Sequence, residues 1–243
     1  MTDIVLFNAG VSTCSQRVRF VLAEKGIAYT DQRLRLDQGQ HLTPDYLAIN
    51  PNGLLPALVH DGQVIVDSSV INEYLEEVFP TPRLVPVQPV ARAHMRAWVV
   101  YLDEVMTPAI RYPSFQQFFG GGLRNMTPEQ RQAFASRLPL RKDFALEIGP
   151  QGFPDEKLAA AMARIEQSLE RMERALADKP WMADRQITLA DIAMMPSVVR
   201  LEDLGMSHLW AGRPNVAHWY ARLQDRPAFA AAYGPGSRLG AGA

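Results

Sequence analysis

The chain has 243 residues and a formal net charge of −1, with 25 Lys and Arg against 26 Asp and Glu. Hydrophobic residues make up 47% of it and charged residues 21%, which is typical of folded proteins and excludes a disordered or collagen-like chain. This balance provides no global field that would attract nucleic acid or an anionic membrane, so we expect neither as a partner.

The first 80 residues alternate short apolar runs with stretches of helical periodicity. The predicted strands are residues 4–7, 29–36, 57–60 and 64–66, and the predicted helices are residues 15–25, 44–49 and 68–79. Residues 29–36 alternate apolar and charged side chains, which predicts a strand with one solvated face. Asp61-Gly62 is a dipeptide typical of a tight hairpin and joins the last two strands. The predicted order is β-α-β-α-β-β-α, an α/β fold with a mixed sheet.

A cluster of prolines marks the end of this unit, with Pro80, Pro82, Pro86 and Pro89 inside ten residues. Proline removes a backbone donor and interrupts helices and central strands. We therefore predict a first domain over residues 1–80, a linker over 81–89 and a second domain over 90–243. Only helical periodicity follows the linker, so the second domain is predicted to be all-helical.

Two helices of the second domain carry clear signals. The first covers residues 155–177, and the second begins at Thr188, which forms a capping-box pattern with Asp191. Pro196 lies inside the second helix and predicts a kink or an early end.

Two stretches of the second domain are less regular. Residues 107–153 are expected to form helical segments around a mobile loop, and the glycine-rich segment after Tyr233 is expected to be a frayed tail. The first stretch contains the aromatic residues Tyr112, Phe115, Phe118 and Phe119. They are candidate walls of a substrate pocket, although aromatic residues at helical spacing more often form a hydrophobic core.

Cys14 is the only cysteine, which excludes an intrachain disulfide and a cysteine-based zinc site. The N-terminus lacks the basic and apolar regions of a signal peptide, and no apolar run reaches the roughly 20 residues that cross a bilayer. A cytoplasmic protein is therefore expected. The histidines lack metal-ligand spacing and no glycine-rich phosphate motif is present, so neither a metal nor a nucleotide is expected.

Hydroxyl and thiol groups gather between the first strand and the first helix, in Ser12-Thr13-Cys14-Ser15. The free amides and the dipole of a helix N-terminus favour negative charge, so a thiolate would be stabilised there. The alternative is that Thr13 or Ser15 merely caps the helix and that Cys14 is a small buried residue.

Two further positions could hold a ligand. Leu55-Pro56 precedes a strand, and by base rate alone its peptide bond would be trans. Asp67 and Ser68 open a helix, where free amides could bind an anionic group. Their alternative role is ordinary helix capping.

Four separated motifs resemble those of the cytosolic glutathione transferase superfamily. They are STCSQRVR at residues 12–19, NPNGLLPAL at 50–58, VDSSVI at 66–71 and ITLADI at 187–192. They span both predicted domains in the superfamily's order. The resemblance implies a thioredoxin-like N-terminal domain, an all-helical C-terminal domain, glutathione as co-substrate and a homodimer.

The resemblance also implies roles for individual residues. It makes Pro56 cis, so that the backbone of Leu55 pairs with the cysteinyl part of glutathione. Asp67 and Ser68 correspond to the residues that hold the γ-glutamyl end. Gln40, or else His41, corresponds to the residue that holds the glycine carboxylate.

Two subgroups of the superfamily share further features with the chain. Residues 12–19 and 190–196 look like the zeta class, which includes maleylacetoacetate isomerases. Residues 70–80 and 152–156 look like bacterial β-aryl etherases, which use glutathione to cleave lignin-type ethers. The choice between these subgroups stays open.

The resulting hypothesis is an enzyme in which Ser12 or Ser15 donates a hydrogen bond to the glutathione thiolate. The thiolate would attack an apolar, aromatic small-molecule electrophile, with β-aryl ether cleavage as one version. Cys14, which matches the beta-class cysteine, could instead form a mixed disulfide with glutathione. The alternatives are a zeta-like cis–trans isomerase and a non-catalytic binding module.

Overall fold

A computed structural model describes residues 3–240. Its four-stranded sheet has the order β2-β1-β3-β4. The elements of this part are β1 (Ile4–Asn8), α1 (Thr13–Glu24), β2 (Thr30–Arg33), α2 (Pro44–Ile49), β3 (Ala57–His60), β4 (Gln63–Val66) and α3 (Ser68–Val78). β1 is parallel to β2 and antiparallel to β3, which pairs antiparallel with β4. The predicted order and the mixed sheet are confirmed.

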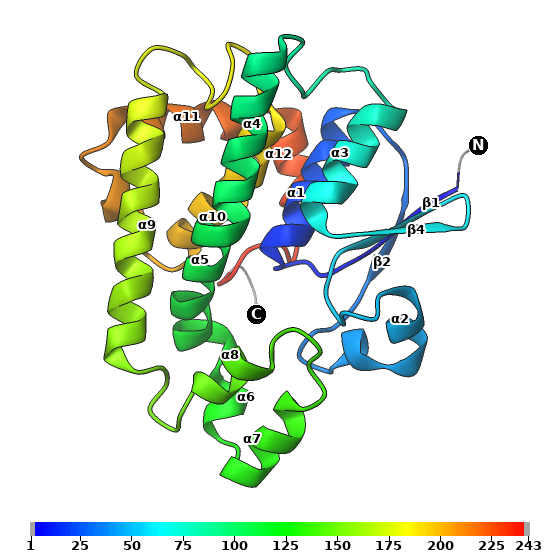
Figure 1. Ribbon diagram of the computed structural model, residues 1–243, viewed down its shortest axis with the longest axis vertical. Helices are drawn as coiled ribbons and strands as arrows, with labels where there is room; N and C mark the ends of the chain where they lie inside the picture. The colour runs from blue at the N-terminus through cyan, green and yellow to red at the C-terminus, as the bar shows by residue number, and fades with distance from the viewer. Residues whose placement is uncertain (1–2, 241–243) are drawn as a thin grey trace.

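The helices cover the sheet unequally. In Figure 1, α1 and α3 lie together on one side of the sheet and α2 lies on the other. The β3–β4 hairpin turns at Asp61 and Gly62, whose φ angles are 48° and 79°. A two-residue type I′ turn needs positive φ at both positions, which is why this dipeptide sets the hairpin.

β2 is shorter and more exposed than the alternation of residues 29–36 predicts. All of Thr30–Arg33 is exposed, so the strand has no buried face. It forms the edge of the sheet and pairs only with β1. The last contact is the Leu34 amide, which donates to the Asn8 carbonyl at 2.8 Å before the chain leaves the sheet.

The second part is helical, as predicted: within residues 3–240 no strand follows β4. Its helices are α4 (Pro89–Tyr101), α5 (Thr107–Ser114), α6 (Gly121–Arg124), α7 (Pro128–Ala135), α8 (Lys142–Glu147), α9 (Asp155–Ala175), α10 (Leu189–Asp203), α11 (Pro214–Gln224) and α12 (Pro227–Ala232). π-helical turns at Leu102–Met106 and Phe115–Phe119 flank α5. None of these described helices is long and apolar enough to cross a membrane.

α10 runs through Pro196 to Asp203, so the early end predicted at the proline is wrong. The helix is buried on nearly all sides, and packing outweighs the one backbone hydrogen bond that proline removes. The N-terminus of α10 is capped by Thr188, as predicted. Asp191 is fully buried and accepts from the Thr188 amide at 2.9 Å, the Met182 amide at 2.8 Å and Trp219 Nε1 at 2.9 Å.

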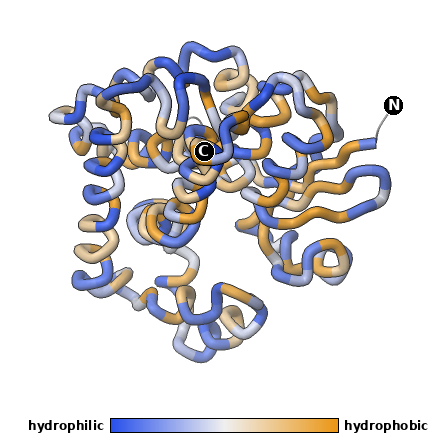
Figure 2. The backbone as a smooth tube through the Cα atoms, turned by 45° about the horizontal axis from the view of Figure 1, so that its top comes forward, coloured by the Kyte–Doolittle hydropathy of each residue, from blue (hydrophilic) through white to orange (hydrophobic). Residues whose placement is uncertain are grey.

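One hydrophobic core joins the sheet to the helices. α1 packs against α3 and also against α10 and α12, and the cluster extends from Leu6 in β1 to Trp219 in α11. Figure 2 shows hydrophobic stretches concentrated in the strands, while the outer helices alternate hydrophobic and hydrophilic turns. A smaller cluster lies under α6, α7 and α8. α1 therefore contacts both the sheet-containing part, through α3, and the helical part, through α10 and α12.

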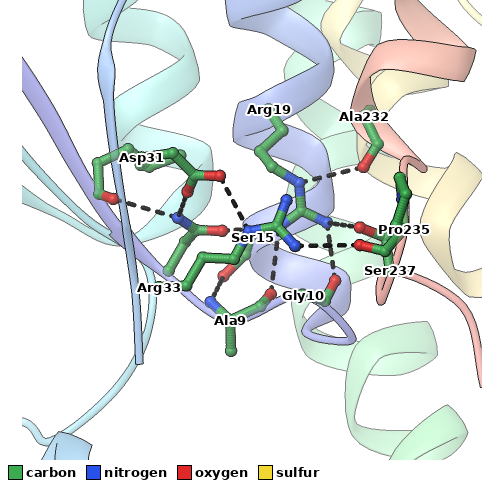
Figure 3. A network of polar contacts seen from close by, with 11 residues as sticks. Ala9, Gly10, Ser15, Arg19, Asp31, Arg33, Ala232, Pro235 and Ser237 are labelled. Atoms are coloured by element: carbon green, nitrogen blue, oxygen red, sulfur yellow. Dashed lines mark hydrogen bonds and ion pairs between the residues drawn. The ribbon is translucent and has the colours of Figure 1, made fainter. Parts of the chain in front are cut away.

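Residues 234–240 are packed against α1, so the frayed tail predicted after Tyr233 is wrong for these residues, and residues 241–243 lie outside the described part. Ser237 is 1% exposed, and its carbonyl accepts from Gln16 Nε2 at 2.7 Å. A Cβ placed on Gly10 would lie 2.2 Å from the Gly236 carbonyl oxygen. Glycine at position 10 lets the two backbones come into contact. A glycine-rich composition alone does not distinguish such a contact from a flexible segment. Figure 3 shows this contact region.

Candidate functional site

The first candidate residues lie in the turn between β1 and α1. Ser12 is the N-cap of α1, and its Oγ accepts from the Ser15 amide at 3.3 Å. Ser15 is fully buried, and its own Oγ accepts from the Ala9 amide at 3.3 Å. Cys14 is half-buried and free in the first turn of the helix. Ser12 and Cys14 thus reach the surface, whereas Ser15 supports the turn from beneath.

Two buried arginines hold the backbone of this turn. Arg19 donates to the Ala9 carbonyl at 3.1 Å and to the Gly10 carbonyl at 2.7 Å (Figure 3). Arg200, on α10, donates to the Val11 carbonyl. Burial lowers the pKa of Arg19 and lowers that of Arg200 to about 10, so Arg200 remains charged near neutral pH. Three consecutive carbonyls are therefore held before any ligand binds.

The Leu55–Pro56 peptide bond is cis, as the family resemblance implies and against the base rate. The preceding carbonyl, of Leu54, accepts from Asn50 Nδ2 at 2.8 Å and from the Tyr46 hydroxyl at 2.5 Å. Within residues 3–240 no hydrogen bond uses the amide or the carbonyl of Leu55. Both groups are available to a ligand that lies along this edge.

Asp67 and Ser68 lie at the N-terminus of α3. Asp67 has a φ of 72° and is the N-cap: its Oδ1 accepts from the Ser69 amide at 2.9 Å and the Val70 amide at 3.3 Å. Ser68 is buried, and its Oγ accepts from Arg17 Nη1 at 3.4 Å. The capping role considered for Asp67 is thus present, while its Oδ2 has no partner among residues 3–240.

Arg17 and Asp103 join this site and were missed as functional residues by sequence reasoning. Arg17 is buried and donates to Asp103 Oδ1 at 2.7 Å and to Thr107 Oγ1 at 2.6 Å. Ser69 Oγ donates to Asp103 Oδ2 at 2.6 Å. A charged residue in the buried stretch of α1 was the available signal for Arg17, but nothing local links Asp103 to it.

Gln40 and His41 lie in the short helical turn Gln40–Leu42. Gln40 Oε1 accepts from the Arg35 amide at 2.8 Å, so this side chain bonds to the backbone of the loop that precedes it. His41 is half-buried; burial and the charge of Arg137 lower its pKa below the ordinary value. The positive charge of Arg137, from the helical domain, therefore disfavours a second positive charge on His41.

The aromatic residues that the sequence singles out in the helical domain do not all pack into one cluster. Tyr112 packs on Phe153 with ring centroids 4.8 Å apart, and Phe115 packs on Phe144 at 5.0 Å. These contacts belong to the small hydrophobic cluster, as the core interpretation predicts. Phe118 is exposed instead. In the part of the chain that the structure describes, no group of His, Cys, Asp and Glu could hold a metal ion.

Comparison with known proteins follows the same two-part division. Residues 11–78 match the Glutathione S-transferase, N-terminal domain, and residues 155–222 match the Glutathione S-transferase, C-terminal domain. A tetrachloro-p-hydroquinone reductive dehalogenase of Sphingobium chlorophenolicum is 27% identical over 94% of this chain and 95% of its own length. A maleylacetoacetate isomerase of Pseudomonas aeruginosa is 30% identical over 81% of this chain and 80% of its own length.

Among solved structures, the beta-etherase LigF from Sphingobium sp. strain SYK-6 superposes with a TM-score of 0.86 at 26% identity. The match covers 95% of this chain and 98% of that one. The likeness thus extends over both the sheet and the helices.

Proposed function

This chain belongs to the glutathione S-transferase family, and from that premise we propose that it activates the glutathione thiol for attack on an aromatic electrophile. The observation that carries the proposal is the turn before α1, where Ser12 and Cys14 reach the surface at a helix N-terminus. The unpartnered backbone of Leu55 supports glutathione as the co-substrate.

Ser12 is the proposed donor to the thiolate. Its Oγ already accepts a hydrogen bond from the Ser15 amide, which leaves the hydroxyl proton free to point outward. A thiol with a pKa near 8.5 is only about 3% ionised at pH 7, and lowering that pKa by two units requires about 2.7 kcal/mol. One charge-assisted hydrogen bond together with the helix N-terminus supplies this amount. Ser15 is buried and less suited to the role.

The cysteinyl and γ-glutamyl parts of glutathione would be held at Leu55 and at the N-terminus of α3. The amide and carbonyl of Leu55, beside Pro56, would pair with the cysteinyl unit. Ser68, the N-terminus of α3 and the buried cation of Arg17 would hold the γ-glutamyl carboxylate. Asp67 Oδ2 would accept from the γ-glutamyl amino group.

The opposite end of glutathione would lie toward the turn that contains Gln40 and His41. Either side chain could bind the glycine carboxylate, and the nearby charge of Arg137 would add to the attraction. Because Gln40 is already bonded to the Arg35 amide, His41 is the stronger alternative.

The reaction class rests on the relatives. The overall likeness to the beta-etherase structure supports β-aryl ether cleavage, in which the thiolate displaces a phenolate from carbon. The maleylacetoacetate isomerase relative supports a cis–trans isomerase as the second candidate. A binding module without turnover is the third, and it is disfavoured because Ser12, Cys14 and Ser68 are all present.

Cys14 offers a separate thiol chemistry. Its thiolate could attack the sulfur of a glutathione conjugate, forming a Cys14–glutathione disulfide while the substrate carbon leaves with the electron pair and takes a proton. A second glutathione thiolate would then release glutathione disulfide and restore Cys14. The half-exposed position of Cys14 and the reductive dehalogenase relative favour this thiol chemistry as a further candidate.

A homodimer is proposed for the exposed face of α3 and α4. Val70 and Val100 are 56% and 57% exposed, and they line a groove with Ile65 and Val99. Apolar patches of this kind commonly mark protein interfaces. Light scattering of the unmodified chain and of Val70→Asp tests the dimer, since the charge should shift the mass to that of a monomer.

We also propose a reducing, cytoplasmic compartment, which agrees with the free cysteine.

The function is tested by glutathione-dependent turnover of a chromogenic β-aryl ether, a halonitrobenzene and a maleyl-type cis-diacid, with glutathione binding followed by calorimetry. Ether cleavage would support the etherase version, and isomerisation of the diacid would favour the second candidate. Glutathione binding without turnover of any substrate supports the binding module. Absence of glutathione binding would overturn the proposed site.

A further inference from the structure

The C-terminal segment, residues 234–240, is bound at both of its ends to other parts of the chain. The Pro235 carbonyl accepts from Arg33 Nη1, on the edge strand β2, at 3.2 Å. The Leu239 amide donates to Asp203 Oδ2, on α10, at 3.1 Å. The segment therefore connects the edge of the sheet to the helical part of the chain, and Figure 3 shows it beside the turn before α1.

Arg19, a buried residue of α1, joins this segment to the turn. A guanidinium has five N–H groups, and here Nε makes one hydrogen bond while Nη1 and Nη2 make two each. Two acceptors lie near the C-terminus: the Ala232 carbonyl at 3.1 Å and Ser237 Oγ at 3.4 Å. The others lie at the end of β1 and in the turn: Asn8 Oδ1 at 2.8 Å, the Ala9 carbonyl at 3.1 Å and the Gly10 carbonyl at 2.7 Å. The orientation of the guanidinium thus depends on both sets of acceptors.

Gln16 makes a second connection between the segment and the turn. Its Nε2 donates to the Ser237 carbonyl at 2.7 Å, and its amide donates to the Ser12 carbonyl at 2.9 Å. Both Gln16 and Ser237 are buried. Removal of one partner from a buried hydrogen bond leaves the other partner unsatisfied. The segment and the turn are therefore energetically coupled.

We propose that the C-terminal segment positions the turn that carries Ser12, with Ser237 as a positioning residue that acts through Arg19. The inference rests on the proposed function for its effect on the thiol, whereas the coupling of segment and turn stands by itself. Ser237 is 1% exposed, so it acts on the turn and does not touch a ligand. Its influence should appear in the pKa of the bound thiol, because the proposed contacts of the glutathione backbone lie elsewhere, at Leu55 and α3.

The test uses two substitutions in the full chain and one control. Ser237→Ala leaves one N–H of Arg19 without an acceptor, and Gln16→Met leaves the Ser237 carbonyl without its donor. Ser207→Ala is the matched control, because Ser207 is exposed and lies outside these contacts.

The first measurement is the thiolate absorbance of bound glutathione against pH. Ser237→Ala and Gln16→Met should each raise the pKa of that thiol by about 0.5 to 1 unit, because Ser12 would be held less well for its hydrogen bond to the thiolate. Affinity for S-methylglutathione, which has no free thiol, should stay unchanged by calorimetry. A general loss of structure would weaken the binding of this analogue as well.

The second measurement is hydrogen exchange of the unliganded protein, which needs no glutathione. Amides of residues 9–16 should exchange roughly 10-fold faster in Ser237→Ala and Gln16→Met, because local opening of the turn would require less free energy. Amides of residues 57–66, which form the β3–β4 hairpin, should change less. Ser207→Ala should leave both regions as they are in the unmodified protein.

The outcomes separate this inference from the proposed function. Unchanged exchange over residues 9–16 in both variants would overturn the coupling. Faster exchange there with an unchanged pKa of the bound thiol would overturn the positioning role, since the contact would then be structural only. If the unmodified chain bound no glutathione, the proposed function would be contradicted and hydrogen exchange alone would decide the coupling: a local increase would support it, and no increase would overturn it.

Discussion

Arg200 on α10 donates a hydrogen bond to the carbonyl of Val11 in the turn before α1. The same guanidinium donates to Ser114 Oγ at 3.3 Å and lies 5.2 Å from the centroid of the Phe119 ring. One side chain therefore links the helical domain, the π-helical turn after α5 and the turn that carries Ser12. The shape of that turn depends on residues almost two hundred positions away.

Arg200→Met should lower kcat more than it weakens glutathione binding. The substitution leaves the Val11 carbonyl without its donor, which we expect to destabilise the protein by about 1–3 kcal/mol. It should also reduce kcat roughly 10-fold through misplacement of Ser12. Steady-state kinetics and denaturant unfolding measure both effects. Arg200→Lys should recover part of kcat, and recovery of neither quantity would contradict this positioning role.

Substitution of the two serines should separate catalysis from structure. Ser12→Ala removes the proposed donor, so the pKa of bound glutathione should rise and kcat/KM should fall roughly 10- to 100-fold. It also removes the N-cap of α1, at about 1 kcal/mol of stability. Ser12→Thr serves as the control because it keeps the hydroxyl. The thiolate absorbance of the glutathione complex, followed against pH, reports the pKa directly.

Ser15→Ala should behave differently from Ser12→Ala. It removes the acceptor of the buried Ala9 amide, so the free energy of unfolding should fall by about 1–3 kcal/mol. The pKa of bound glutathione should change little. If Ser15→Ala raised that pKa and Ser12→Ala did not, the roles of the two serines would be reversed.

His41 should make stability depend on pH. Its pKa is lowered in the folded protein relative to the ordinary value of 6.5, so the unfolded state binds the proton more readily. Stability should therefore fall as pH decreases through 6.5 and rise again as pH increases, by the linkage of proton binding to folding. Unfolding curves between pH 5 and pH 8 in His41→Gln should lose this component. An unchanged slope would assign the pH dependence to other groups.

Gly10→Ala should displace the segment that follows Tyr233. The added methyl group would overlap the Gly236 carbonyl, and overpacking of this kind costs about 1–3 kcal/mol. Gly122→Ala is the matched control, because a Cβ there meets nothing within 4 Å. Thermal unfolding and limited proteolysis near Gly236 should respond to the first substitution alone.

Local patterns in the sequence were sufficient for most of the fold. The Asp61-Gly62 hairpin, the Thr188 and Asp191 start of α10 and the order of strands and helices all depend on residues close together in the chain. The cis bond before Pro56 is different, because physical base rates predict trans and only the family resemblance indicates cis.

Contacts between distant residues could not be predicted in this way. Nothing near Arg17 indicates that Asp103 will neutralise it, and nothing near Val11 indicates that Arg200 will donate to its carbonyl. The exposed β2 strand shows a second limit, because alternation identifies a strand without showing that it lies at the sheet edge.

The packing of Ser237 against Gln16 has a consequence for synthesis of the protein. Domains generally fold from the N-terminus as the chain leaves the ribosome. Here α1 and the turn before it emerge early, but the last contacts with Gly10 and Gln16 require residues 234–240. A nascent chain that still has this segment inside the ribosome would therefore hold an incompletely supported form of the proposed glutathione site.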